Sequence, residues 1–212
     1  MPIQEPVVVF TNMLIFVVSV DVVLNLLSTL DFRWHRIFYV LAFSFGGASA
    51  FCGMLYHINK EAFMAAQSQG TLLFGGAMLA SLVMAAIFDN FDWCKARYYA
   101  AIPAIIYSLY LIYIFGIMPQ YSFYPFLVLQ VMGLTAFGLC YLRQRGSQKA
   151  RLINYGIAIL IITSVIDFFS FHFLGLTSDD IFHLLFVASQ IFLYVAIQSD
   201  QRKPIPPEIK PC

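Results

Sequence analysis

Seven apolar runs, each close to the length of a membrane span, constrain what this chain can fold into. They cover residues 7–30, 37–57, 65–88, 98–118, 122–142, 153–173 and 180–197. About 20 helical residues cross the roughly 30 Å of hydrocarbon in a bilayer. Only 11% of the residues are charged, whereas soluble domains average about 25%. The sequence therefore predicts an all-α, polytopic membrane protein built as a bundle of seven transmembrane helices.

The rest of the chain is short. We expect one seven-helix domain over residues 1–200 and a flexible cytoplasmic tail over residues 201–212, because the tail is rich in proline. A further soluble domain has no room beside seven spans.

The cationic residues predict the orientation of the bundle. With seven spans, Lys60 is the one residue among 12 Lys and Arg that falls on the opposite side from the others. Short loops rich in Lys and Arg stay in the cytoplasm, so we expect the N-terminus outside and the C-terminus inside. This distribution follows the topology and gives no reason to expect nucleic acid as a partner; membrane lipids are the expected partners. The absence of an Asn-x-Ser/Thr acceptor is compatible with a bacterial inner membrane.

Histidines and acids gather near one edge of the predicted bundle. His57 ends the second run, His172 lies near the end of the sixth, and His183 lies in the first turn of the seventh. Asp179 and Asp180 stand at the start of the seventh helix, at the same non-cytoplasmic level. Imidazoles and carboxylates from three helices form a suitable ligand set for zinc.

The spacing within the last helix supports a metal site. Asp179 and His183 are four residues apart, so they share one face of a helix. Both can bind one ion, with His57 as the third ligand and His172 as a further candidate ligand. A plainer interpretation stays open, in which the histidines are interfacial and Asp179 or Asp180 caps the helix.

The segment 179–185, DDIFHLL, resembles the start of the last helix in the CREST superfamily. That superfamily of seven-helix membrane proteins includes alkaline ceramidases and progestin/adiponectin-type receptors. Its pattern is His-x-x-x-His in helix seven and Ser-x-x-x-His in helix two. His183 and His57 match this pattern, whereas Asp179 takes the place of the first helix-seven histidine and Gly53 that of the serine.

The resemblance implies an intramembrane zinc hydrolase acting on lipid amides or esters, or a receptor derived from one. The family also carries an Asp on helix three, where this chain offers Gln67 and Gln69 as the nearest polar residues. In the enzyme interpretation, Asp180 accepts a proton and His172 serves as a fourth ligand or an acid. The zinc would lie on the non-cytoplasmic side of the membrane.

Other function classes remain. One is a non-catalytic receptor or scaffold with a structural metal, and another is a small transporter in which Asp21, Asp167 and Gln130 line a path. A retinal protein is excluded, because the last helix contains no lysine. We expect Asp21 to make a helix–helix contact, and Gln130 and Gln190 to form hydrogen bonds between helices.

Overall fold

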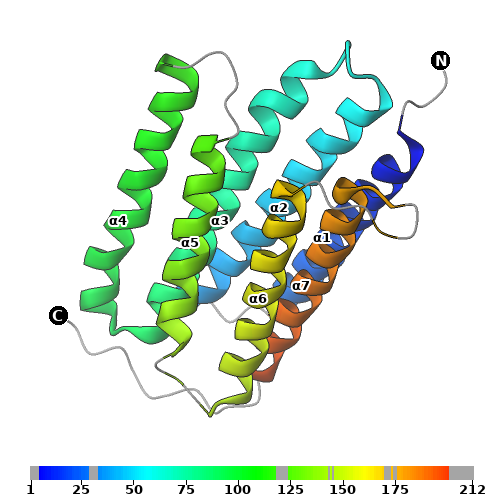
Figure 1. The fold of residues 1–212 in the computed structure, drawn as a ribbon. Helices are drawn as coiled ribbons and strands as arrows, with labels where there is room; N and C mark the ends of the chain where they lie inside the picture. Colours follow the sequence, from blue (N-terminus) through cyan, green and yellow to red (C-terminus); the bar gives the residue numbers. More distant parts are fainter. Residues whose placement is uncertain are drawn as a thin grey trace.

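The chain is all-helical, as expected from the apolar runs. The computed structural model describes residues 5–28, 33–117, 124–142, 144, 146–169, 173 and 176–200. These residues include seven helices that are long and apolar enough to cross a membrane (Figure 1). The segment 201–212, expected to be a flexible tail, lies outside the described residues.

Each helix overlaps one predicted run. The elements are α1 (Pro6–Ser28), α2 (Trp34–Ile58), the π-helix η1 (Ala66–Thr71), α3 (Leu72–Asn90), α4 (Trp93–Ile112), the π-helix η2 (Tyr113–Ile117), α5 (Tyr124–Leu142), α6 (Gln148–Phe168) and α7 (Ser178–Asp200). Helices α4 and α6 each begin five residues before their apolar runs, because the Gln, Lys and Arg residues there also favour helix. Helix α6 ends at Phe168, before residue 172.

Six of the helices close into a ring. Neighbours around the ring are α1 and α2, α2 and α3, α3 and α5, α5 and α6, α6 and α7, and finally α7 and α1. Helix α4 packs on α3 outside this ring, and Figure 1 shows it at one side of the bundle. The ring therefore has an inside that side chains from different helices can share.

Two tyrosines hold α4 against α3. The hydroxyl of Tyr107 donates to the carbonyl of Leu73 at 2.9 Å, and that of Tyr110 donates to the carbonyl of Leu72 at 3.2 Å. Gly76 makes this approach possible, because a Cβ atom there would lie only 2.9 Å from the Tyr110 ring. Gly76 therefore allows α4 to pack closely against α3.

The outer surface of the bundle is apolar, as a lipid-facing surface must be. Phe10, Leu24 and Leu109 are each about 60% exposed. Asp21 is also exposed on α1, and Asn25 donates to its backbone carbonyl at 2.8 Å. The carboxylate of Asp21 makes no hydrogen bond or ion pair with the described part of the chain, so the helix–helix contact expected for it is not found there.

A buried network around one ion pair joins four helices at the end of the bundle where α3 ends and α6 begins. We term this end the Asp89 end. The ammonium of Lys149 lies 2.7 Å from the Asp89 carboxylate, and the two side chains are 7% and 9% exposed. Tyr141 donates a hydrogen bond to the same carboxylate. The hydroxyls of Tyr141 and Tyr39 are 2.6 Å apart, which extends the network to α2.

Replacing Lys149 with Met should destabilise the protein by about 3 kcal/mol, because it leaves a buried carboxylate without its cation. The double variant K149M/D89N should recover much of this loss, since no charge is then left unpaired. Thermal unfolding of the purified variants in detergent measures both effects. Equal stability of the single and double variants would show that the pairing is unimportant.

Candidate functional site

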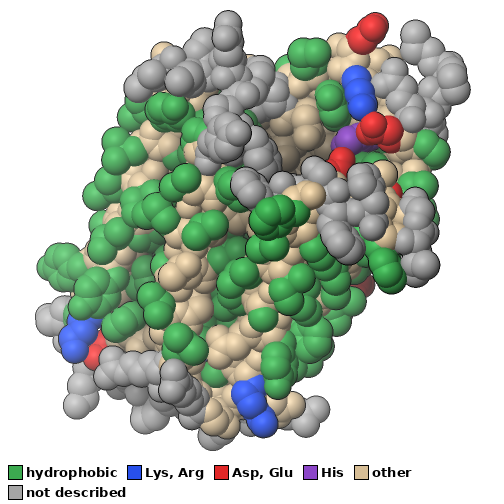
Figure 2. All heavy atoms as spheres, viewed as in Figure 1, with side chains coloured by type: hydrophobic (Ala, Val, Ile, Leu, Met, Phe, Trp, Pro, Cys, Tyr) green, Lys and Arg blue, Asp and Glu red, His purple; other side chains and the backbone are tan. Residues whose placement is uncertain are grey.

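A cavity of about 180 Å³ lies inside the ring. It is at the end of the bundle where α2 ends and α7 begins, which we term the His57 end. Figure 2 shows a hollow at this end, beside gathered charged and histidine side chains. Its polar lining comes from α7 and from four other elements, which are α1, α2, η1 and α5. The polar residues are Asn12, Ser49, His57, Gln67, Thr71, Gln130, Asp179 and His183.

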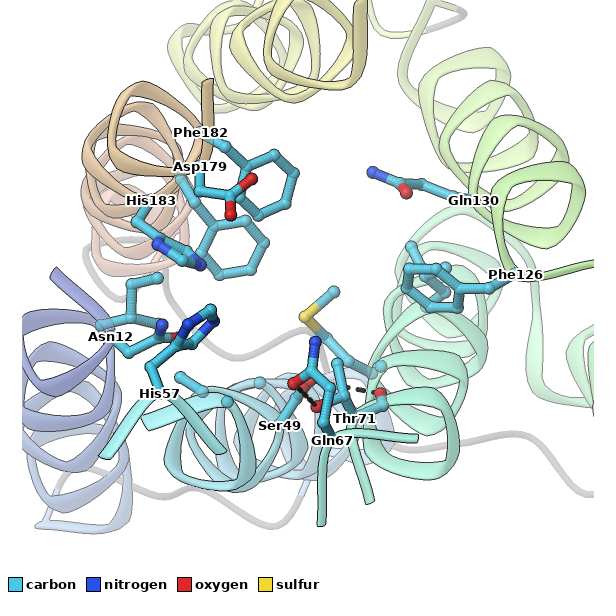
Figure 3. A pocket seen from close by; sticks show the side chains of 18 residues that line it. Asn12, Ser49, His57, Gln67, Thr71, Phe126, Gln130, Asp179, Phe182 and His183 are labelled. Carbon is cyan, nitrogen blue, oxygen red and sulfur yellow. Dashed lines mark hydrogen bonds between the residues drawn. The ribbon is translucent and has the colours of Figure 1, made fainter. Parts of the chain in front are cut away.

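His57 and His183 line this one cavity although they are far apart in the sequence. His57 stands in the last turn of α2 and His183 in the second turn of α7. They lie on the same side of the cavity, together with Asp179 and Asn12 (Figure 3). Ring closure between α1, α2 and α7 is what brings the two imidazoles to a shared wall.

Each imidazole is held through its Nδ1 atom. Nδ1 of His57 hydrogen bonds to the Glu5 carboxylate, and Nδ1 of His183 lies 3.2 Å from the Thr11 hydroxyl. Among the described residues, neither ring makes a further hydrogen bond. Histidines that ligate metals are usually oriented in this way, with one ring nitrogen on an oxygen partner and the other left for the ion.

Glu5 also pairs with Lys60, whose ammonium lies 2.7 Å from the second carboxylate oxygen. Hydrogen bonds from Lys60 and His57 hold the pKa of Glu5 below its ordinary value of 4.5, against a smaller opposing effect of burial. The hydrogen bond between Lys60 and Glu5 raises the pKa of Lys60 above its ordinary value of 10.5. The histidine is therefore oriented by a carboxylate that stays ionised at neutral pH.

Asp179 lies on the exposed rim of the cavity, on the same face of α7 as His183. The predicted sharing of a face by these two residues is confirmed. Within the described residues, however, no three His, Cys, Asp or Glu side chains are grouped closely enough to hold a metal ion. His57, Asp179 and His183 thus share a cavity without forming a preformed three-ligand cluster.

Asp180 has a different environment from its neighbour. It is buried, and its Oδ2 atom accepts hydrogen bonds from the backbone N–H and the hydroxyl of Thr177, at 2.9 and 2.7 Å. The backbone N–H of Asp180 donates back to the Thr177 hydroxyl at 3.3 Å. This reciprocal pattern is that of a capping box, so the alternative of a helix cap holds for Asp180. Its predicted role as a proton acceptor stays a prediction, as does that of His172, which lies outside the described residues.

Asn12 fills the space opened by Gly53. A Cβ atom at Gly53 would lie 3.0 Å from Oδ1 of Asn12, whose amide nitrogen donates to the carbonyl of Val8 at 3.1 Å. The place where the resemblance expects a serine therefore holds an amide oxygen from α1. This exchange is not evident from the sequence, because it depends on which face of α1 meets α2.

Sequence analysis missed the contributions of Glu5 and Thr11, and of Gln67 as a cavity residue. Gln130, expected to bond to another helix and, in the transporter alternative, to line a path, does form the interhelical hydrogen bond, with Ser164 of α6 at 2.8 Å. The expected bond of Gln190 is confirmed as well, with Ser19 of α1 at 2.8 Å. The one sequence feature that could have indicated a contact of Glu5 is its charge, directly before an apolar run.

The fold and cavity define a seven-helix membrane protein with a polar pocket at one end of its bundle. A family model described as a family of unknown function (DUF6962) matches residues 7–202, and the chain belongs to this family. No curated protein matches the chain, and no solved structure does.

Replacing Glu5 with Gln should lower the thermal stability at pH 7 by no more than about 1 kcal/mol, because the Lys60 pair is partly exposed. The folded-state pKa of Glu5 is lowered, so its contribution is present above pH 4.5 and is lost as the pH falls through the folded pKa. The unfolding midpoints of E5Q and wild type should therefore converge on acidification. The exposed neighbour variant E61Q is the control, and a gap that persists at low pH would contradict the assignment.

Proposed function

We propose that this protein is an intramembrane, zinc-dependent hydrolase acting on a lipid amide or ester. The observation that carries the proposal is the pair His57 and His183, which line one cavity from separate helices and are each held at Nδ1. The resemblance of the α2 and α7 motifs to the CREST superfamily supports the same activity.

The donor set fits a zinc ion. His57 and His183 would hold it through their remaining ring nitrogens and Asp179 through its carboxylate, which is a common set of zinc ligands. When bound, zinc polarises a carbonyl oxygen and makes a water molecule acidic enough to act near neutral pH. The three side chains line the cavity without being clustered, so binding requires them to converge on the ion.

The remaining residues orient these ligands. Glu5 and Thr11 fix the planes of the two imidazoles, and Lys60 keeps Glu5 ionised. These contacts orient both imidazoles before a ligand enters the cavity.

The cavity walls favour a lipid. Phe126, Phe182, Phe186 and Leu79 provide apolar surface next to the polar groups. A lipid whose carbonyl lies near headgroup depth would place its polar part among the histidines and its chain against these side chains. Lateral entry between helices suits such a substrate.

Zinc content tests the metal site. Wild-type protein purified without chelator and equilibrated with zinc should hold about one ion per chain, and H183A and H57A should lose most of it, because each removes one of three ligands. H35A is the matched control, since His35 lies at the other end of α2 and is absent from the cavity lining. Elemental analysis measures the bound metal.

Full zinc occupancy in H183A, or none in wild type, would refute the metal site. Hydrolysis of a lipid amide and a lipid ester, with and without chelator, then separates an enzyme from a receptor or scaffold that holds a structural metal. A transporter would show neither retained zinc nor hydrolysis.

We further propose that the His57 end faces the non-cytoplasmic side, in a bacterial inner membrane. The support is the positive-inside rule, since Lys60 stands at that end while Lys95 and Arg97 stand at the Asp89 end.

Labelling of single cysteines tests this orientation. In a background without native cysteines, K60C should react with a membrane-impermeant maleimide in spheroplasts, and K95C should react only after the membrane is opened. The two positions are matched in residue type, and the reverse pattern would invert the topology.

A further inference from the structure

Two glutamines line the cavity in addition to the histidines. Gln130 points into it from α5, across the cavity from His183, and Gln67 points into it from η1, beside Ser49 and Thr71 (Figure 3). The metal site proposed above uses neither glutamine. Each glutamine has one end of its amide engaged by the protein and the other directed to the cavity.

The orientation of Gln130 is fixed by the neighbouring helix. The hydroxyl of Ser164 donates to the carbonyl of Leu160 at 2.9 Å, so its proton is already committed. Its oxygen can therefore only accept, and Nε2 of Gln130 donates to it at 2.8 Å. The carbonyl oxygen of the Gln130 amide is left as an acceptor, and it makes no hydrogen bond with the described residues.

Gln67 offers the complementary group. Its Oε1 atom accepts a hydrogen bond from the Thr71 hydroxyl at 3.1 Å, within the π-helix η1. Its Nε2 donor makes no hydrogen bond within the described part of the chain. Short π-helical segments often occur at functional sites, because they turn side chains out of the regular helical register.

A buried amide needs a partner. The Gln130 side chain lines the cavity and is only 8% exposed, so its carbonyl oxygen is satisfied best by a donor on the molecule that occupies the cavity. A ligand that places a donor near Gln130 and an acceptor near Gln67 would satisfy both groups at once.

We propose that Gln67 and Gln130 form a recognition site for a ligand group that both donates and accepts hydrogen bonds, namely a hydroxyl or an N–H amide. This rests on the proposed function, in that it takes the cavity to hold the polar part of a lipid. A simple ester has no donor for Gln130. The glutamine pair therefore selects lipids with a hydroxyl or amide over plain esters of the same chain.

Binding of two matched probes tests the proposal. N-oleoylethanolamine carries N–H and O–H donors, and methyl oleate carries the same acyl chain without a donor. Both are used in tritiated form on the full chain in nanodiscs, with empty nanodiscs as background and with chelator present throughout. Wild type should bind the amide more tightly, and Q130L should weaken amide binding about tenfold while leaving ester binding unchanged.

Q190L is the matched control. Gln190 is also a buried glutamine hydrogen-bonded to a serine of another helix, but it does not line this cavity. Q190L should keep the wild-type preference. If Q130L cannot be purified as a folded protein, the same binding measurements are made on Q67L, because Gln67 lies in η1 at the end of the bundle.

The proposal is overturned if wild type does not prefer the amide, if Q130L or Q67L leaves the preference intact, or if Q190L reduces it equally. Because zinc is chelated in every arm, this result is independent of the metal test. If wild type binds no zinc but still prefers the amide, the hydrolase proposal is refuted and the recognition site is still supported.

Discussion

The structure depends on one constraint, that backbone polar groups in hydrocarbon must find partners within their own segment. Seven apolar runs can meet this only as helices, and most of their surface faces lipid. Polar side chains then have little choice of place, because an exposed polar group in lipid is unfavourable. Closing six helices into a ring gives these side chains a shared interior.

The two ends of the ring use that interior differently. At the Asp89 end, Lys149 neutralises the carboxylate and two tyrosines extend the network, so the polar groups satisfy one another. At the His57 end, the imidazoles are paired on one nitrogen and the amides on one atom, which leaves groups directed at an open cavity. A closed network suits stability, whereas a half-satisfied one suits binding.

Sequence reasoning reached the histidine pair because the topology placed His57 and His183 at one level, and helical spacing placed Asp179 with His183. It could not separate Asp179 from Asp180, since only the turn before α7 decides which carboxylate caps the helix. It also missed Glu5 and Asn12. Their roles depend on how α1 is rotated against α2. Polar residues occur on both sides of α1, since Asn12 and Ser19 are buried whereas Asp21 is exposed, so polarity does not mark the inner face.

Run length and hydropathy are local properties of the chain, so they are enough to predict the seven helices and their approximate limits. The closed ring with α4 outside it, the meeting of Gln67 and Gln130 with the histidines at one cavity, and the exposure of Asp21 arise only in the folded bundle. These outcomes come from the packing of side chains between helices distant in sequence. Hydropathy cannot encode them, since all faces of these helices are similarly apolar.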